Sequence, residues 1–478
     1  MHNYSPQKKF SRPQLYEDYD LLKKILEEFH PSLYWYTSKD SMDYFFAQQR
    51  AAIGDSLTEQ QFGFRILAPL TTHIRCGHTS FNFSKQYTRF FDSRVLPSFP
   101  LSFKIWGDTM IVTSNMNRKD SMIKRGTQLL SVNGMNARQL ADTMFRYLPT
   151  DGYAENLNYI RLSGSFPYYH RNIFGLTRQY RIDYLDSNNI QKQATVPVYI
   201  PDTTSAGRIR VTQSVIRSPG EIKKARRENI RSLEIDTALH LAVMTVNSFD
   251  GGGKLKKFYK TSFKKIKKEK IQHLVVDIRS NGGGKVNYYT RLARYIRPTP
   301  FKVADTAVSI RKNFKNFGKY FQNTFLNSVA LFLFTSKYKD GRFHLRYWEN
   351  HVYKPKKKYH YNGNVYVLIN GPTFSASTLF CHTVKGLENV TLIGEETGGG
   401  HHGNNGLMIP YVTLPNTRIR VRVPMFRLVQ YNHIPKNGRG VMPDIYVAPS
   451  AFAIRNGIDL KMEKVRQLVR EKETISIR

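Results

Sequence analysis

The sequence predicts a multidomain α+β protein that ends in an α/β core, and two patterns carry this prediction. From residue 229 onward, continuous apolar runs rich in valine and isoleucine alternate with segments of helical periodicity, as expected for buried strands joined by helices. Ahead of this region, residues 99–200 read as short strands of alternating polarity and residues 1–98 as helices. With 478 residues, of which 40% are hydrophobic, the chain is long enough to bury several cores.

Changes in composition divide the chain into five segments. Apolar residues of the first segment recur at helical spacing and stop at His30-Pro31. Residues 300–360 are aromatic and basic without clear periodicity, which indicates an insertion. We expect an N-terminal helical domain at 1–98, a β domain at 99–200, a polar linker at 201–228, an α/β core at 229–455 with the insertion at 300–360, and a C-terminal helix or tail at 456–478.

The α/β core is the most clearly patterned part of the chain. Its expected strands are 239–246, 274–278, 365–369 and 390–394. Its expected helices are 255–268, 286–296 and 378–385.

The chain is strongly basic, with 73 Lys and Arg against 36 Asp and Glu, for a formal charge of +37. Such an excess creates a strong positive field, and we expect association with anionic surfaces through it. No zinc-finger spacing and no RNA-binding signature is present, so no specific nucleic-acid partner is expected. Binding to nucleic acid or another anionic polymer remains an alternative that charge alone motivates.

Cysteine usage is sparse. Cys76 and Cys381 are the only two, which excludes a disulfide framework and a zinc site made of cysteines. We expect two buried free thiols, with a pair that meets across a site as the alternative. No metal or cofactor is expected.

No run of about 18 apolar residues is present, so no membrane span is predicted. The first residues lack an apolar signal core. We therefore expect either a cytosolic protein or a chain that begins after a removed export signal.

The stretch Val365-Tyr-Val-Leu-Ile-Asn-Gly-Pro-Thr-Phe-Ser-Ala-Ser-Thr378 reads as strand, tight turn and helix N-terminus. A serine at such an elbow has free backbone N–H groups beside it and the positive end of a helix behind it, which suits a nucleophile that builds an oxyanion. Ser375 is the candidate, and Ser377 the local alternative inside the helix. The other interpretation is that these serines only cap the helix.

A second motif, Asp277-Ile-Arg-Ser-Asn-Gly-Gly-Gly284, also follows a buried strand and opens a helix. It lacks the spacing of phosphate-binding glycine loops. Bare backbone N–H groups directed at a forming oxyanion are the other use of such a loop.

Four motifs in this order resemble the tail-specific, or C-terminal processing, serine peptidases, and most closely their tricorn-like branch. They are the two above, Gly394-Glu-Glu-Thr-Gly-Gly-Gly400 and Gly440-Val-Met-Pro-Asp-Ile445. The resemblance implies a protease core of the ClpP/crotonase type, with Ser375 as nucleophile and the N–H groups of Gly283 or Gly284 and of Ala376 as the oxyanion hole. It also implies that the segment 99–200 is a PDZ-like domain.

The general base departs from the Ser/Lys members, because Gly400 stands where they carry a lysine. The tricorn-like branch takes a histidine from the end of the N-terminal region, and His78 in Cys76-Gly-His-Thr79 fits that pattern. An imidazole suits proton removal near neutral pH. His401 and His402 are rival bases, or shape the rim of the substrate site.

Two residues are candidates for the third member of a triad. The tricorn-like branch uses a glutamate, and the corresponding place here holds Asn437. Asn437 can orient a histidine but cannot offset its charge, and Asp444 is the nearest carboxylate in the sequence. Neither is preferred.

The resemblance therefore implies an endopeptidase that cleaves unfolded or C-terminal polypeptide segments. The PDZ-like domain would capture the chain end in the loop of Lys124, Arg125 and Gly126. The alternative is a catalytically impaired relative that binds peptides or lipophilic ligands. Because family members are usually exported, the cell envelope is the expected compartment.

Overall fold

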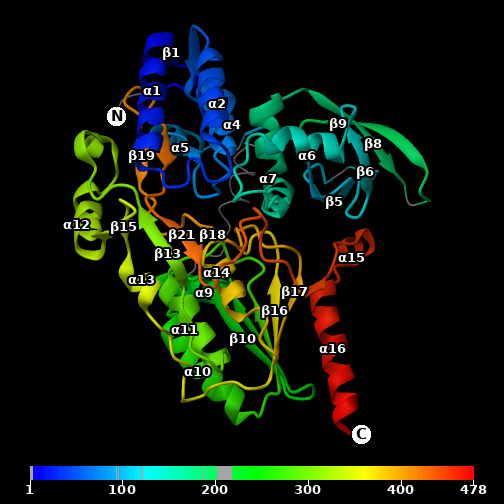
Figure 1. Ribbon diagram of the computed structural model, residues 1–478. Helices are drawn as coiled ribbons and strands as arrows, with labels where there is room; N and C mark the ends of the chain where they lie inside the picture. The colour runs from blue at the N-terminus through cyan, green and yellow to red at the C-terminus, as the bar shows by residue number, and fades with distance from the viewer. Residues whose placement is uncertain are drawn as a thin grey trace.

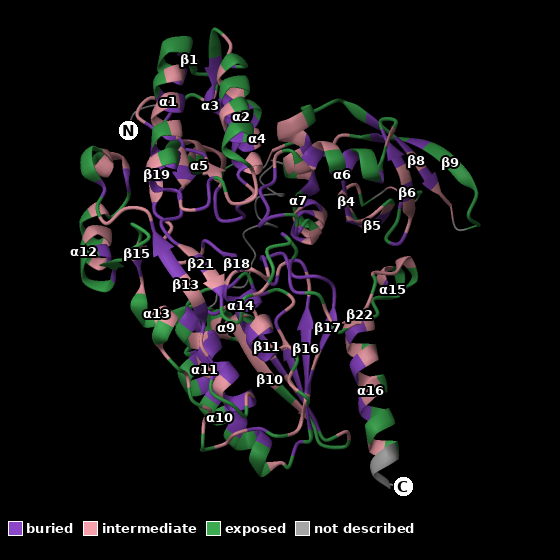
Figure 2. Cartoon of the chain, viewed as in Figure 1, coloured by how far each residue is buried: buried purple, intermediate pink, exposed green. Residues whose placement is uncertain are grey.

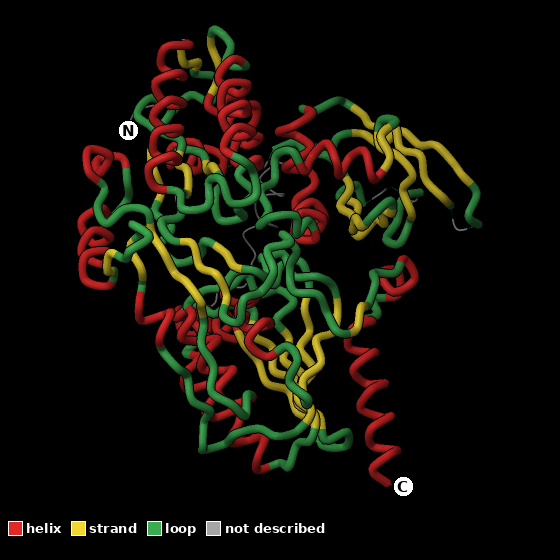
Figure 3. The backbone as a smooth tube through the Cα atoms, viewed as in Figure 1, coloured by secondary structure: helices red, strands yellow, loops and turns green. Residues whose placement is uncertain are grey.

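The structure is a computed structural model that describes residues 4–92, 94, 96–118, 120, 122–186, 188–201 and 218–477. It contains the mixed α and β domains that the sequence predicts, and the fold class is confirmed (Figures 1 and 3). The helical N-terminal region lies at one end, the α/β core at the other, and the domain of residues 99–200 beside the N-terminal region (Figure 1).

The core is built on a six-stranded sheet. Strand β10 pairs antiparallel with β11, and the other neighbours pair in parallel, as expected where helices cross over between strands. In spatial order the strands are β10 (Arg231–Asp236), β11 (Leu241–Val246), β12 (His273–Asp277), β16 (Asn364–Ile369), β17 (Val390–Gly394) and β22 (Ile445–Tyr446).

Helices cover both faces of this sheet. One face packs against α10 (Leu255–Lys268), α11 (Val286–Ile296) and α14 (Ala376–Val384) in the largest apolar cluster. The other face packs against α16 (Leu460–Ile477) through Val465 and Val469. The purple inner stripes of these helices show this burial in Figure 2. Ser375 and the glycine loop lie where β16 and β12 end and where α14 and α11 begin.

Two smaller sheets join the core to the rest of the molecule. One has the order β14 (Ser336–Lys337), β15 (Phe343–His344), β13 (Ala304–Ser309), β21 (Arg427–Gln430) and β18 (Gly403–Asn404). The other has the order β19 (Tyr411–Thr413), β20 (Arg420–Arg422) and β3 (Phe81–Asn82). Because β3 comes from the N-terminal region and β20 from the core, this pairing fixes the N-terminal region against the core.

The N-terminal region is mainly helical, as predicted. Its helices bury one apolar stripe each, together with side chains of the core. The elements are β1 (Lys9–Ser11), α1 (Arg12–Phe29), α2 (Lys39–Ala51), β2 (Ser56–Thr58), α3 (Glu59–Phe62), a π-helix (Gly63–Leu67), α4 (Ala68–His73) and α5 (Lys85–Asp92).

The domain of residues 99–200 is an antiparallel sheet with two helices. Its own apolar cluster is separate from the others. The elements are β4 (Leu101–Trp106), β5 (Thr109–Asn115), β6 (Gln128–Val132), β7 (Met135–Asn136), α6 (Ala137–Phe145), α7 (Asn156–Phe174), β8 (Gln179–Leu185) and β9 (Gln191–Pro197).

The expected linker 201–228 and the expected insertion 300–360 both contain helices. Residues 202–217 of the expected linker 201–228 lie outside the described residues. The last part of the linker belongs to α9 (Pro219–Ile230), which begins with a capping box formed by Ser218 and Glu221. The insertion holds a 3-10 helix (Lys315–Tyr320), α12 (Thr324–Phe334) and α13 (Arg346–Asn350). The C-terminal segment adds α15 (Ala451–Asn456) before α16. Within the described ranges, no helix combines the length and the apolar character that a membrane crossing requires.

Candidate active site

Ser375 stands at a strained elbow between β16 and α14. Its φ of 55° and ψ of −121° lie in a region that non-glycine residues rarely adopt. Its side chain makes no capping hydrogen bond to the helix, so the capping interpretation does not describe it. Ser377 is the second residue of α14 and is fully buried. Of the two serines, only Ser375 holds its hydroxyl at the head of the helix.

The glycine loop after β12 packs directly against this elbow. The N–H of Phe374 donates to the Asn281 carbonyl oxygen at 3.1 Å, which ties the two turns together. Gly283 has a φ of 104°, and a Cβ there would lie 2.8 Å from the Ser375 Cβ and 3.0 Å from the Ala376 nitrogen. Only glycine fits both this conformation and this approach.

The N–H groups of the loop are not equally available to a ligand. That of Gly283 donates to the Asn281 side chain at 2.9 Å. Among the described residues, no hydrogen bond uses the N–H of Gly284 or that of Ala376, which opens α14. The amides of Gly284 and Ala376 are therefore free to hold an oxyanion.

His78 reaches the site from the N-terminal region. It lies in a tight turn in which the Thr79 N–H donates to the Cys76 carbonyl oxygen, and β3 begins two residues after that turn. The pairing of β3 with β20 therefore carries the histidine to the core. The imidazole is 4% exposed and lies 4.6 Å, ring centre to ring centre, from Phe374, the residue before Ser375.

His78 and Ser375 meet at Gly406. A Cβ on Gly406 would lie 2.8 Å from the Ser375 Oγ and 3.1 Å from the His78 Nε2. Both reactive atoms therefore face the same small space, which a side chain at position 406 would fill. A serine and histidine pair can form its hydrogen bond across such a space, and among the described residues no hydrogen bond yet joins the two atoms.

Asp151 lies on the far side of the imidazole. Its Oδ1 is 3.8 Å from the His78 Nδ1 and accepts a hydrogen bond from the Gly77 N–H at 2.8 Å. Its Oδ2 accepts from the Gly400 N–H at 3.4 Å. Aspartate and histidine are both buried, so their electrostatic interaction is screened weakly. This carboxylate is in position to orient the imidazole and to stabilise its charged form.

The two residues proposed for this role from the sequence lie elsewhere. Asn437 is exposed, and its side chain accepts a hydrogen bond from the Arg439 N–H. Asp444 forms an ion pair with Lys385 and accepts from the Leu392 N–H, which closes a turn of the core. Neither contacts His78, because the turn that carries Asp151 packs on the loop 437–440 and occupies the intervening position.

The rival bases also have other partners. The Nε2 of His401 lies 3.1 Å from the Nδ1 of His382, and burial lowers the pKa of His401 to about 4. The Nδ1 of His402 lies against the carbonyl oxygen of Ile434. Among the hydrogen bonds of the described residues, neither side chain reaches Ser375.

The loop proposed to hold a substrate carboxylate is covered. The N–H of Gly126 donates to the Val112 carbonyl oxygen, and its own carbonyl accepts from Arg455 on α15. The Arg125 Nε donates to the Ile454 carbonyl oxygen. Lys124 stands exposed at the edge of this loop. The loop therefore packs against α15, away from Ser375.

One set of side chains has the composition of a metal site. A donor atom each from Cys76, His78 and Asp151 lies within 4.8 Å of the others. Burial raises the pKa of Cys76 to about 12, and the thiol accepts a hydrogen bond from Asn405. A zinc ligand must be a thiolate, so metal binding here would require this thiol to lose its proton. Cys76 and Cys381 are buried free thiols, as predicted.

Three residues of the site were not found from the sequence. In the sequence, Asp151 is an acidic residue in a turn and Gly406 is a glycine in a loop, and neither pattern indicates a catalytic site. Asn404 accepts from the Gly406 N–H at 2.9 Å, and its buried Nδ2 has no partner among the described residues. That amide is a spare donor beside the reactive pair.

Comparison with known proteins agrees with this geometry. Residues 240–447 match Peptidase family S41. Among curated proteins, none matches the sequence. Of the solved structures, mature CPAF is 14% identical with a TM-score of 0.64, covering 96% of this chain and 96% of that one. Mature CPAF in complex with lactacystin is 14% identical with a TM-score of 0.62, covering 96% and 98%. At such identities the likeness shows the fold alone.

The strained serine elbow and the glycine loop both lie inside the matched segment. The family match and the fold are those of a serine peptidase, a hydrolase that acts on polypeptides. Its core, residues 240–447, matches Peptidase family S41, as the resemblance to the tail-specific and C-terminal processing peptidases led us to expect.

Proposed function

We propose that the protein is an endopeptidase that cleaves unfolded or C-terminal polypeptide segments through Ser375. The approach of the Ser375 Oγ and the His78 Nε2 to one point beside Gly406 carries this proposal. The hydroxyl is a weak nucleophile alone and needs a base within proton-transfer reach. A buried histidine beside it supplies that base.

The reaction is acyl transfer in two steps. The Ser375 Oγ attacks the scissile carbonyl carbon while the His78 Nε2 takes the hydroxyl proton, and the oxyanion receives hydrogen bonds from the Ala376 and Gly284 amides. His78 then gives the proton to the leaving amine. Water repeats the sequence, and the acyl group leaves Ser375 as a free carboxylate.

Asp151 is the positioning residue of this proposal. It would hold the imidazole with its Nε2 toward Ser375 and stabilise the positive charge that forms on the ring. The separation of 3.8 Å from the Nδ1 is longer than a hydrogen bond. Catalytic hydrogen bonds often tighten only when substrate is bound, so the resting distance is compatible with this role.

The domain of residues 99–200 would capture the substrate chain end. Because Arg455 covers the loop at Gly126, capture there requires α15 to move away from the domain. We further propose a location in the cell envelope, where a formal charge of +37 suits anionic surfaces.

A fluorophosphonate probe, which reacts covalently with an activated serine, tests the nucleophile. We expect stoichiometric labelling that Ser375→Ala abolishes. Ser377→Ala is the matched control, because it removes a hydroxyl two residues away and should leave labelling unchanged. Labelling should rise between roughly pH 6 and 9 as an imidazole base loses its proton.

The alternative is a relative that binds peptides or lipophilic ligands without cleaving them. It is favoured by the His78 Nδ1, which is buried and has no hydrogen-bond partner within the described part of the chain. A folded wild-type protein that shows no labelling at any of these pH values would select this alternative.

A further inference from the structure

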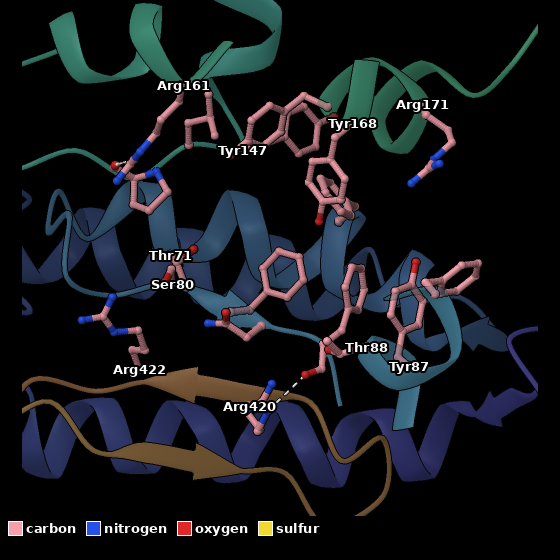
Figure 4. A pocket seen from close by; sticks show the side chains of 18 of the residues that line it. Thr71, Ser80, Tyr87, Thr88, Tyr147, Arg161, Tyr168, Arg171, Arg420 and Arg422 are labelled. Atoms are coloured by element: carbon pink, nitrogen blue, oxygen red, sulfur yellow. Dashed lines mark hydrogen bonds between the residues drawn. The ribbon is translucent and has the colours of Figure 1, made fainter. Parts of the chain in front are cut away.

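A cavity of about 530 Å³, drawn in Figure 4, lies beside Gly77 in the turn that carries His78. It is enclosed by α7, the segment 80–92 and β20. Gly77, whose N–H donates to Asp151, forms part of its wall, and Ser375 does not. The cavity is therefore separate from the proposed catalytic space but adjoins its histidine and aspartate.

Four arginines line this cavity, and we call it the arginine pocket. Figure 4 shows Arg161 and Arg171 approaching from α7, and Arg420 and Arg422 from β20 on the opposite side. Asp92 is the one acidic residue in the wall, and it is exposed. The pocket therefore concentrates positive charge on two facing walls.

No carboxylate of the described residues forms an ion pair with any of the four. The Arg161 Nη1 donates to the Pro149 carbonyl oxygen at 2.7 Å, and the Arg420 Nε donates to that of Phe83 at 3.1 Å. The buried carboxylate of Glu59 instead accepts from Tyr4 and Ser84. The Arg161 Nη1 also donates to the Asn158 Oδ1 at 3.3 Å. Within the described part of the chain the other guanidinium N–H groups have no hydrogen-bond acceptor, so they are available to a ligand.

The positive charge in the pocket is costly without a ligand. Burial lowers the pKa of Arg161, and the neighbouring Arg422 lowers it further. Guanidinium groups bind carboxylates through paired, charge-assisted hydrogen bonds, and such contacts recover the cost of desolvation. Tyr168, Tyr87 and Tyr147 stand around the same space and add hydroxyl donors and ring faces (Figure 4).

We propose that the arginine pocket is an exosite for an acidic segment of the polypeptide substrate. Arginines on two facing walls suit carboxylates that project to both sides of an extended chain, as alternate side chains do. The pocket adjoins the turn of His78, so a chain held there lies close to the catalytic space. The assignment to a substrate rests on the proposed peptidase function, but binding itself does not require hydrolysis.

The test measures binding of a fluorescein-labelled oligoglutamate peptide to the Ser375→Ala protein by fluorescence anisotropy. The double variant Arg171→Gln/Arg420→Gln in that background should bind at least about tenfold more weakly, because each residue supplies charge-assisted hydrogen bonds. Lys264→Gln/Lys267→Gln is the matched control. It removes the same charge from the exposed face of α10 and should change affinity less than about twofold.

Three results would overturn the exosite. They are an equal loss of peptide affinity in both double variants, an unchanged peptide affinity in the pocket variant, and tighter binding of inorganic pyrophosphate than of the peptide. Single Arg171→Gln, at a half-buried position, repeats the measurement if the double variant is unstable. Fluorophosphonate labelling of the pocket variant with Ser375 intact reports the catalytic site separately, so failure of one proposal is distinguishable from failure of the other.

An independent observation concerns α12, which lies at the edge of the molecule and is mostly exposed (Figures 1 and 2). Its sequence, Thr-Phe-Leu-Asn-Ser-Val-Ala-Leu-Phe-Leu-Phe, is apolar on nearly every side. Leu331 is buried and anchors it, while Phe325 is 78% exposed. Its other exposed apolar residues are Leu326, Val329, Phe332, Leu333 and Phe334.

Basic residues surround this apolar helix. Between residues 311 and 342 the chain has seven Lys and Arg and a single acid, Asp340. Asp340 pairs with His344, and Arg311 pairs with Glu28. The Lys312 Nζ lies 4.4 Å from the centre of the Phe332 ring. The surface therefore combines exposed Phe and Leu with a rim of positive charge in which, among the described residues, only Arg311 forms an ion pair with an acidic side chain.

We infer that α12 docks into the headgroup region of an anionic lipid bilayer. Two effects favour membrane binding of an exposed apolar helix with flanking lysines. Its apolar side chains are buried at the acyl boundary, and its lysines are attracted to anionic headgroups. A second copy of this chain is disfavoured as the occupant, because it would bring the same basic rim and the same charge of +37 against the first.

Co-sedimentation with lipid vesicles tests this surface. We expect binding to vesicles rich in phosphatidylglycerol, much weaker binding to phosphatidylcholine alone, and a loss of at least about tenfold on Phe325→Asp/Leu333→Asp. Phe452→Asp is the matched control, because Phe452 is similarly exposed at 67% but lies on α15. Equal binding to both vesicle types would overturn the inference. It would also be overturned if the wild type does not bind vesicles but forms a dimer in sedimentation velocity that the α12 variant abolishes.

Discussion

Replacing Asp151 with asparagine tests the carboxylate beside His78. The change removes one negative charge but keeps an oxygen that can accept the hydrogen bond of the Gly77 N–H. The turn that carries His78 should therefore keep its conformation, and an effect on the rate would report the charge and the orientation of the ring.

The expected size of the effect follows from the distance between the two side chains. At 3.8 Å between the His78 Nδ1 and the Asp151 Oδ1, an imidazolium and a carboxylate attract by about 4 kcal/mol at an effective dielectric constant of about 20. The imidazolium forms only as the reaction proceeds, so the loss falls on the barrier. About 1.4 kcal/mol corresponds to a tenfold change in rate, so kcat should fall by about 10³-fold.

Steady-state cleavage of an unfolded polypeptide with a fluorescent reporter measures this. We expect a fall in kcat with KM nearly unchanged, because the ion pair stabilises the transition state rather than the bound substrate. Asn437→Ala is the control, because this exposed residue lies away from His78 and its loss should change kcat less than about twofold. A variant Asp151→Asn that turns over at the wild-type rate would refute the positioning role.

Three further changes test the site and the stability of the fold. His78→Ala should lower turnover by about 100-fold or more, and near-normal turnover would show that another group is the base. Gly406→Ala places a Cβ 2.8 Å from the Ser375 Oγ, so it should lower turnover at least about 100-fold while far-ultraviolet circular dichroism stays unchanged; an active variant would contradict the shared space. Burial lowers the pKa of His170 from 6.5 to about 4, so the unfolded chain takes up this proton first and stability is lost as the pH falls from 6.5 to 4. His170→Phe, which keeps the ring packing, should recover up to about 3 kcal/mol at low pH in urea unfolding, and an unchanged pH slope would refute this assignment.

Local periodicity was sufficient to predict much of the core. The expected helices 255–268 and 286–296 coincide with α10 and α11, and the expected strand 390–394 with β17. These elements bury one stripe or both faces, so the pattern of apolar residues records their structure. The helix α12 was not predicted, because a helix that is apolar on all sides has no such periodicity.

The residues of the candidate site also divide into those that local sequence patterns predicted and those that they did not. Ser375 and the glycine loop could be found because strand, turn and helix follow one another in the sequence, and the proposed nucleophile and the proposed oxyanion amides belong to those turns. The third member could not, and Asn437 and Asp444 were chosen because they are near a family motif. Asp151 reaches His78 only because its turn docks on the loop 437–440.

The sequence by itself determined the resemblance to a peptidase family, through its four motifs. It also determined the α/β core and the two turns that present Ser375 and the free amides, because short-range chain geometry fixes them. The tertiary structure decided which histidine and which carboxylate lie near the serine. His78, Asp151 and Gly406 come from three separate parts of the chain, and only the docking of the N-terminal region and of residues 99–200 on the core brings them within a few ångströms of one another.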